Sequence, residues 1–305
     1  ATEVVVRGID AASATGSDSH LRIALGIGGG GGVKVCEGLA VRPAARDAEL
    51  EVATDVVGKV DAAKIGLVDE VVSFERCVAE SDIVIVAVPV GTAVKMVCDI
   101  LDRFRDTGEK DKVVLDTCST KEQITLATRY HPCRGQFVST HPMAGTEYSG
   151  PWAAMPGLFD GRACIFADAG ESSPRALKTV EGLYAALNMR PIYMDASSHD
   201  VHTAYVSHIS HVTSFALALT VLDKEKDEKH IFDLASGGFS STVRLAKSNP
   251  DMWVPILSQN RDNVLRVIDT YIEKMGLFRK AIAGFDEEGI RSLIEEANKI
   301  KKIIR

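Results

Sequence analysis

Clustered cysteines are missing from this sequence. The chain of 305 residues has six cysteines, with no CxxC pair and none beyond residue 164. They are Cys36, Cys77, Cys98, Cys118, Cys133 and Cys164. A disulfide framework or a zinc site would bring cysteines together at short spacings. We therefore expect reduced and mostly buried thiols.

An excess of positive charge is missing as well. The chain carries 35 lysines and arginines against 42 acidic residues, which gives a formal net charge of −7. Proteins that bind nucleic acids or anionic membranes usually present a basic patch or stripe. The charge balance therefore argues against both kinds of partner.

The sequence also has no long uninterrupted apolar run. The longest candidate, residues 83–90, contains Pro89 and is followed by Gly91, and it falls well short of the roughly 18 residues of a membrane span. The first 20 residues carry four charged side chains and lack the apolar stretch of a secretory signal. We therefore expect a cytoplasmic protein.

Up to residue 197, the sequence contains short apolar strands that alternate with helical segments. Strands are expected at residues 21–25, 50–54, 71–72, 83–88, 112–115, 137–139, 163–167 and 191–194, and residues 4–6 fit a further short strand. Helices are expected at 60–65, 92–104 and 174–187, the last with Ser173 as its N-cap and Pro174 at its first position. This alternation predicts right-handed βαβ units and a parallel sheet covered on both faces. We expect one α/β domain over residues 1–197, with residues 1–20 as an extension of unassigned role.

The character of the chain changes after residue 197. Residues recur at steps of three and four along the segment 201–222, which is the pattern of one helix face. They are Val201, Ala204, Tyr205, His208, Val212, Phe215, Leu219 and Leu222. Two charge-rich segments, 223–229 and 295–302, are interpreted as solvated faces or connections. We expect residues 198–305 to form a second, all-α domain.

A glycine-rich turn follows the first strong strand. Gly26, Gly28 and Gly31 match the pattern GxGxxG. In this pattern the first glycine permits a tight turn, the second lets the backbone approach a pyrophosphate, and the third allows a helix to pack closely on the strand. The turn lies between a strand and an expected helix, as a dinucleotide-binding fold requires. A flexible glycine loop is the alternative.

Asp55 lies at the end of the next strand. A carboxylate there would accept hydrogen bonds from a ribose 2′-hydroxyl and would repel a 2′-phosphate, which favours NAD over NADP. The alternative is that Asp55 caps a turn. With the glycine pattern, Asp55 predicts that the first domain is a Rossmann-like dinucleotide-binding domain.

Four further segments carry residues suited to chemistry. They are DTCSTK at 116–121, THPMAGTE at 140–147, HD at 199–200 followed by SHISH at 207–211, and GGF at 237–239 followed by RLA at 244–246 and DMW at 251–253. Together they resemble the prephenate/arogenate dehydrogenase family, over about residues 21 to 275. The resemblance implies a Rossmann-like domain, an all-α domain that pairs two subunits into a homodimer, and NAD as the cofactor.

The resemblance also implies a reaction, the oxidative decarboxylation of prephenate to 4-hydroxyphenylpyruvate in tyrosine biosynthesis. Hydride leaves the ring carbon that bears the hydroxyl, a base takes the hydroxyl proton, carbon dioxide departs and the ring becomes aromatic. Histidine is the side chain suited to such a base near neutral pH. The resemblance assigns this role to His141 and makes Ser119 a catalytic partner that orients it or the reactants. For Ser119, the capping of a helix is the alternative.

The carboxylates of prephenate need donors. The resemblance assigns the side-chain carboxylate to Arg244, because a guanidinium fits a planar carboxylate; an exposed helix arginine is the alternative. His208 and His211, three residues apart on one helix face, are also assigned to the substrate, although His208 fits a hydrogen-bonded core histidine equally well. No metal is expected, because the HxxH spacings come with neither HExxH nor a thiolate cluster.

Glu147 bears on the choice of substrate. A carboxylate near the substrate side chain would favour the ammonium group of arogenate, so an arogenate dehydrogenase that yields tyrosine directly is the alternative activity. Glu147 could equally pair with a cation of its own domain. A non-catalytic dinucleotide-binding sensor or scaffold stays open, although it would need none of His141, Ser119 and Arg244. A β-hydroxyacid dehydrogenase would leave the SHxxH segment unexplained.

Overall fold

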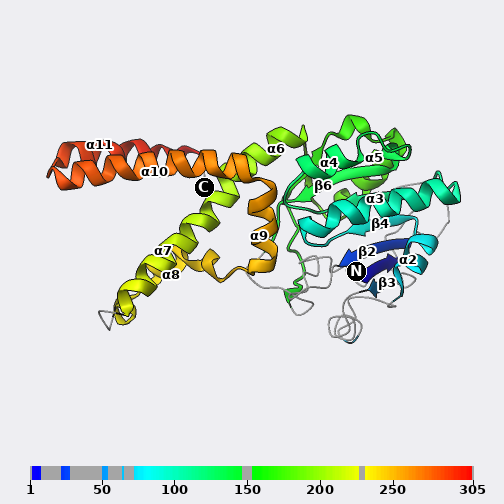
Figure 1. Ribbon diagram of the computed structural model, residues 1–305, viewed down its shortest axis with the longest axis horizontal. Helices are drawn as coiled ribbons and strands as arrows, with labels where there is room; N and C mark the ends of the chain where they lie inside the picture. The colour runs from blue at the N-terminus through cyan, green and yellow to red at the C-terminus, as the bar shows by residue number, and fades with distance from the viewer. Residues whose placement is uncertain are drawn as a thin grey trace.

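The computed structural model describes residues 2–7, 22–27, 50–53, 64, 72–145, 153–226 and 231–303. Four residues of the predicted site, namely Gly28, Gly31, Asp55 and Glu147, lie outside these ranges, as does nearly all of the expected helix at 60–65. In the described part, a region built on a β-sheet is followed from Ala196 onward by helices (Figure 1).

The sheet of the described residues has eight strands in the order β1-β3-β2-β4-β5-β6-β7-β8. They are β1 (Thr2–Arg7), β2 (Arg22–Ile27), β3 (Leu50–Ala53), β4 (Ile83–Val86), β5 (Val113–Asp116), β6 (Phe137–Pro142), β7 (Ala163–Ala167) and β8 (Arg190–Met194). The five strands from β3 to β6 in this order run parallel. The predicted parallel α/β sheet is therefore confirmed for the centre of the sheet.

The edges of the sheet differ from the prediction. β1 pairs antiparallel with β2 and β3, and β7 runs antiparallel to β6 while β8 runs parallel to β7. The apolar runs predict where strands lie but not their direction, which depends on how each connection returns to the sheet. Residue 72 belongs to no strand, so the prediction of a short strand at 71–72 is wrong there.

Helices cover both faces of the sheet. On one face, α5 (Pro174–Ala186) packs Ala176, Val180 and Leu183 against alternate strand residues such as Ile83 and Ile85. On the other face, α3 (Val90–Thr107) packs against the intervening residues, among them Val84 and Val86. Because successive side chains of a strand point to opposite faces, β4 and β5 are buried at every position. The lack of alternation in the sequence follows from this double cover.

Helix α5 begins where the sequence predicted. The side chain of Ser173 accepts a hydrogen bond from the backbone N–H of Ala176, and Pro174 occupies the first turn. Two shorter helices also belong to the described part of the sheet region, α2 (Phe74–Glu80) and α4 (Glu122–Thr128). The N-terminus of α4 faces the helical region, and this contact matters for the candidate site.

The remaining described helices follow β8. They are α6 (Ala196–Thr203), α7 (Ile209–Glu225), α8 (Gly237–Thr242), α9 (Pro250–Gln259), α10 (Arg261–Ala283) and α11 (Glu287–Ala297), with a π-helical turn at Ala204–His208 and a 3₁₀ turn at Arg244–Lys247. Helix α9 packs on α3 and places Trp253 and Ile256 in the core of the sheet region. Helices α10 and α11 form an antiparallel pair that projects away from the sheet, and α7 diverges from it (Figure 1).

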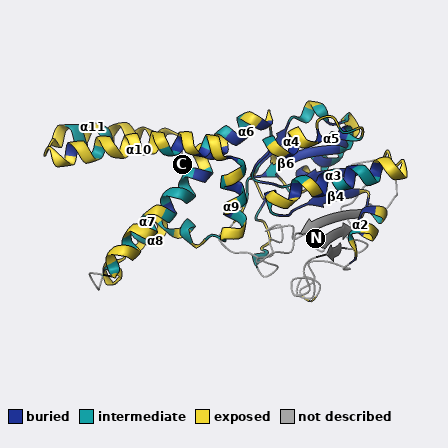
Figure 2. Ribbon diagram, in the orientation of Figure 1, coloured by how far each residue is buried: buried dark blue, intermediate teal, exposed yellow. Residues whose placement is uncertain are grey.

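Much of the projecting part is exposed (Figure 2). Its own buried cluster contains Ala204, Val264 and Val267. Large apolar side chains on its surface include Leu219, Leu222, Tyr271, Ile272, Met275, Leu277, Ile282 and Phe285. Exposed apolar surface on this scale is typical of a face that another protein surface covers.

The predicted apolar face of residues 201–222 is only partly buried. Ala204 and His208 are buried, whereas Tyr205, Leu219 and Leu222 are exposed. A π-helical turn at Ala204–His208 interrupts the α-helix of this segment. The prediction that these residues share one helix face stays a prediction.

One helical run among the described residues, Ala196–Glu225, has the length and composition of a membrane-spanning helix. It has 30 residues, and its most apolar window has a mean hydropathy of 1.3, with 11% of that window buried. The run begins with the buried polar residues His199, Asp200 and Thr203, which are bonded to the sheet region or within α6.

Candidate active site

The carboxyl ends of β5 and β6 lie side by side. Asp116, the last residue of β5, is in register with Ser139 of the parallel strand β6. Ser119 follows β5, and His141 lies near the end of β6. Both predicted catalytic residues therefore belong to the edge of the sheet at which the parallel strands end, the edge that carries ligand sites in open α/β folds.

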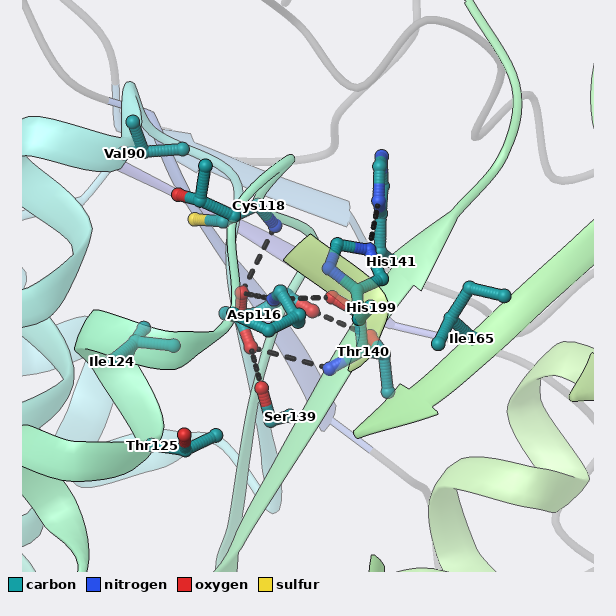
Figure 3. Close-up of polar contacts among 12 residues, drawn as sticks. Val90, Asp116, Cys118, Ile124, Thr125, Ser139, Thr140, His141, Ile165 and His199 are labelled. Carbon is teal, nitrogen blue, oxygen red and sulfur yellow. Dashed lines mark hydrogen bonds and ion pairs between the residues drawn. The ribbon is translucent and has the colours of Figure 1, made fainter. Parts of the chain in front are cut away.

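Asp116 is fully buried and ties these strand ends together. Its carboxylate accepts hydrogen bonds from the backbone N–H of Cys118 (3.0 Å), the hydroxyl of Ser139 (3.1 Å) and the backbone N–H of Thr140 (3.2 Å) (Figure 3). The buried ammonium of Lys121 pairs with the same carboxylate and donates to the carbonyl of Thr140 at 2.7 Å. Because the backbone at Thr140 is held on both sides, the position of the next residue, His141, is fixed.

His141 contacts the helical region directly. Its Nδ1 lies 2.8 Å from Nε2 of His199 on α6, and the two rings meet edge to face with centroids 5.1 Å apart (Figure 3). His199 is 1% exposed. Burial lowers the pKa of His199 below its ordinary value, and the attraction to the Asp200 carboxylate opposes this without reversing it. The His199 ring is therefore neutral at neutral pH.

Asp200 completes a chain of contacts from α4 to His141. Its Oδ1 lies 2.7 Å from Nδ1 of His199. The same carboxylate accepts the backbone N–H groups of Lys121 (2.8 Å) and Glu122 (3.0 Å) at the start of α4. The amide of Asn260 donates to the backbone carbonyl of Asp200 at 2.6 Å. His141, the predicted base, is therefore held by hydrogen bonds at the contact between the sheet region and the helices.

His208, His211 and Trp253 form a second cluster. His211 stacks on Trp253 with ring centroids 3.5 Å apart, and His208 meets the same indole edge to face at 5.8 Å. His208 is 1% exposed, and its Nδ1 lies 3.1 Å from the amide nitrogen of Asn260. Burial lowers the pKa of His208 to about 4. This environment favours the second reading of His208, a hydrogen-bonded histidine of the interior.

His211 is only partly buried and lies beside the interior cluster. Its Nδ1 is 3.1 Å from the carbonyl of Ser207 one turn earlier, so Nδ1 donates this bond. The indole N–H of Trp253 is buried without a hydrogen-bond partner among the described residues.

Arg244 begins the 3₁₀ turn Arg244–Lys247, which packs against α7, the helix of His211. The side chain is exposed, and the hydroxyl of Ser214 on α7 donates to the carbonyl of Thr242 at 2.6 Å, which anchors the preceding backbone. The structure thus places the turn of Arg244 beside α7, the helix that carries His211 and follows directly on His208. Its assignment to a carboxylate stays a prediction.

Gly26 is the one residue of the glycine pattern within the described ranges. It belongs to β2, in register with Ala53 of β3, so the strand continues to Ile27 rather than ending at residue 25 as predicted. The cofactor roles of Gly26, Gly28, Gly31 and Asp55 stay predictions. Within the described residues, no three His, Cys, Asp or Glu side chains gather in a geometry that could hold a metal ion.

The sequence interpretation missed the roles of His199, Asp200 and Asp116. The pair His199–Asp200 formed part of a recognised segment, but no role was assigned to either residue. The sequence shows a histidine followed by an aspartate in the first helix after the sheet. Two such polar residues near a helix start are by themselves expected to be exposed to solvent. Only the approach of α6 to β6 and α4 shows that both side chains are buried at a junction.

The fold and this sheet edge define a class of protein. Strand β2 lies between β3, the next described strand along the chain, and β4, which lies on its other side. Such a reversal of strand order is the topological switch point at which Rossmann-like proteins bind dinucleotides. The sheet region is thus a nucleotide-binding α/β domain of Rossmann type, followed by a helical domain.

Comparison with known proteins narrows the class to a family. The domain described as "Prephenate dehydrogenase, nucleotide-binding domain" matches residues 42–193, and "Prephenate dehydrogenase, dimerization domain" matches residues 195–296. The chain is 31% identical to the prephenate dehydrogenase of Bacillus subtilis over 234 residues, which is 76% of this chain and 62% of that protein. It is 30% identical to that of Lactococcus lactis over 244 residues, or 79% and 66% of the two chains.

A solved structure agrees. The prephenate dehydrogenase of Aquifex aeolicus, in complex with hydroxyphenyl propionate and NAD+, is 27% identical and superimposes with a TM-score of 0.72 over 81% of this chain and 85% of that chain. This chain belongs to the prephenate/arogenate dehydrogenase family. It spans about two thirds or less of the length of the Bacillus and Lactococcus relatives, 62% and 66%.

Proposed function

We propose that this chain catalyses the NAD-dependent oxidative decarboxylation of prephenate to 4-hydroxyphenylpyruvate. The observation that carries the proposal is the hydrogen bond of 2.8 Å between His141 and His199, which holds an imidazole at the carboxyl edge of the sheet. Membership of the family and the NAD+ bound by the Aquifex relative support the same activity. A cytoplasmic location stays a prediction.

The dinucleotide binds across the ends of β2 and β4 in this proposal. The reversal of strand order between these neighbouring strands supports such a site. Gly26, Gly28 and Gly31 would hold the pyrophosphate, and Asp55 would accept hydrogen bonds from the ribose. When bound, NAD supplies the hydride acceptor for the ring carbon that bears the hydroxyl.

The protein's own residues move the proton and hold the substrate. His141 takes the proton of the ring hydroxyl, and Ser119, which follows the neighbouring strand β5, orients that hydroxyl. Arg244 binds the side-chain carboxylate with two parallel N–H donors. His211 adds a polar contact from α7. A Glu147 carboxylate near the substrate side chain would favour arogenate over prephenate.

The test measures reduction of each nicotinamide with prephenate and with arogenate, for the parent chain and for His141→Asn. We expect turnover of prephenate with NAD, and a loss of about 10²–10⁴-fold in kcat for His141→Asn, the usual contribution of a general base. His202→Asn is the matched control, because His202 is an exposed histidine of the neighbouring helix α6.

Three outcomes would contradict the proposal in different ways. Turnover of arogenate alone would make the chain an arogenate dehydrogenase. Binding of NAD without turnover of either substrate would leave a dinucleotide-binding sensor or scaffold. An unchanged rate for His141→Asn would remove the base.

We also propose that two copies pair through the helical region. The exposed apolar side chains of α7, α10 and α11 support this, because a monomer would leave them in water. The match to the dimerization domain covers the same helices. Pairing also explains how an apolar run such as Ala196–Glu225 can be poorly buried in a single chain.

A further inference from the structure

A continuous line of hydrogen bonds leads from the start of α4 to the ring of His141. The backbone N–H groups of Lys121 and Glu122 meet the carboxylate of Asp200 at 2.8 and 3.0 Å. That carboxylate meets Nδ1 of His199 at 2.7 Å, and Nε2 of His199 meets Nδ1 of His141 at 2.8 Å. Each neutral imidazole carries one proton, on one of its two ring nitrogens. If the donor or acceptor role at one end of the series is known, the protonated nitrogen of each ring follows.

Asp200 is the end of the series at which the donor and acceptor roles are known. A backbone N–H can only donate, so both oxygens of Asp200 act as acceptors towards α4. Oδ1 is also the partner of His199, and a carboxylate that accepts at both oxygens leaves the imidazole nitrogen as the donor. His199 therefore carries its proton on Nδ1.

The remaining assignment follows from neutrality. His199 is buried and its pKa is lowered, so the ring has a single proton, and Nε2 has a lone pair. The bond to His141 then requires a proton on Nδ1 of His141. The other nitrogen of His141, Nε2, consequently carries the lone pair that a proton acceptor needs.

We propose that Asp200 and His199 are positioning residues, which set the tautomer of His141 so that its Nε2 is the proton acceptor. The proposal deepens the function proposed above and rests on it for its catalytic meaning. In the reaction, the hydroxyl proton of the substrate bonds to Nε2 while the Nδ1 proton stays in the hydrogen bond to His199. The O–H bonding pair remains on the substrate oxygen and forms the carbonyl as hydride leaves the ring carbon.

The surroundings support this polarity. Asp200 lies on the same helix as His199, and the other charged groups near the ring are Lys121 and Asp116 of the sheet region, which pair with one another. When His141 becomes a cation, its Nδ1–H already donates to Nε2 of the neutral His199. The other nitrogen of His199 is hydrogen-bonded to the carboxylate of Asp200. The arrangement follows the logic of an aspartate that fixes the tautomer of a catalytic histidine, with a second imidazole inserted between them.

The first test needs no turnover. Selective ¹⁵N labelling of histidine distinguishes a ring protonated on Nδ1 from one protonated on Nε2, and His141→Asn identifies the signals of His141. We expect His141 in the parent protein at neutral pH to carry its proton on Nδ1. A proton on Nε2 would overturn the proposal.

Two variants of His199 sharpen the test. His199→Leu removes the acceptor, and we expect His141 to shift towards the Nε2–H form and kcat to fall by about 10- to 10³-fold, with KM within about twofold. His199→Gln keeps a side-chain oxygen that can accept from Nδ1, and we expect it to recover much of the tautomer and of kcat. Equal losses for both variants with an unchanged His141 tautomer would reduce His199 to a packing role.

The two proposals fail in distinguishable ways. If His141 is protonated on Nδ1 in a way that depends on His199, but the chain turns over neither prephenate nor arogenate, the positioning role stands and the proposed function is wrong. If turnover depends on His141 but the tautomer of His141 does not change with His199, the proposed function stands and the positioning role is wrong. If His199→Leu fails to fold, the spectrum of the parent protein and the His199→Gln variant still decide the question.

Discussion

The sheet region and the projecting helices bury apolar surface in different ways. Strands β4 and β5 are buried at every position between two layers of helices, and residues such as Phe166 and Leu115 have no exposed surface. The projecting helices have a small cluster of their own around Ala204 and leave many large apolar residues in contact with water. The sheet region therefore has a core of its own, and we expect the helical region to need a second subunit to cover its apolar surface.

The largest effect should come from a cavity in the sheet region. Phe166 is fully buried and packs against Tyr184 and Tyr193. We expect Phe166→Ala to lower the free energy of unfolding by about 3–5 kcal/mol, from lost burial and the cavity left behind. Urea denaturation followed by circular dichroism measures this, and the loss should not depend on protein concentration.

Tyr130→Ala is the matched control for the cavity. Tyr130 is an aromatic residue of the same region but is 91% exposed, so the change should stay within about 0.5 kcal/mol. Similar losses for both variants would mean that the sheet core does not dominate the stability of this region.

A charge on the exposed apolar face of α7 should act on assembly instead. Leu219 is 61% exposed, and Leu219→Glu would place a carboxylate in the proposed subunit contact, where desolvation is unfavourable. We expect the dimer dissociation constant to rise by at least about tenfold, or about 1.4 kcal/mol. Sedimentation equilibrium measures it, with the helical content unchanged.

Leu126→Glu controls for the added charge. Leu126 has a similar exposure on α4 of the sheet region, and the substitution should leave the dimer intact. The comparison of the two regions breaks down if both variants associate like the parent chain, or if the parent is a monomer.

An effect of similar size to the loss of assembly concerns pH and the buried histidines at the junction of the two regions. Near His208 the charged or titratable groups are Asp200, His199 and His211. The unfolded chain protonates such a histidine near pH 6.5, whereas burial lowers the pKa of folded His208 to about 4. Between these values the unfolded state binds more protons, so this contribution to stability is complete above pH 6.5 and is lost as the pH falls towards 4.

The expected loss from His208 between pH 7 and pH 5 is about 1–2 kcal/mol, and the lowered pKa of His199 acts in the same direction. Urea denaturation at the two pH values measures it. His208→Gln should reduce the difference, whatever its effect at neutral pH, and the exposed His202→Gln should not. An equal pH dependence in all three proteins would show that other groups cause it.

Much of the fold could be predicted from the sequence because its signals are local. The strands of the parallel sheet appear as short apolar runs, and the start of α5 is marked by a capping serine followed by proline. The direction of β7 and the π-helical turn at Ala204–His208 could not be predicted. The first depends on the path of the connection to the strand, and neither feature leaves a periodic pattern in the sequence.

The candidate site divides in the same way. His141 could be found because its segment HPMAGTE is distinctive, and the structure adds that it lies beside His199. The hydrogen bonds through His199 and Asp200 could not be predicted. His199 is 58 positions from His141, and Asp200, the neighbour of His199, is bonded to backbone N–H groups at the start of α4. For His208, the sequence left two readings open, and burial at 1% exposure favours the interior one.

The sequence by itself determined the chemistry available to this protein: the apolar strands, the glycine pattern, and the residue types His, Ser and Arg in segments that mark the family. Local propensity and side-chain chemistry are properties of neighbouring residues, so they can be recognised in one dimension. The tertiary structure alone decided which of the histidines face one another, which nitrogen of His141 faces His199, and which apolar residues stay uncovered. These depend on the packing of α6 against β6 and α4, and on distances between residues far apart in the chain.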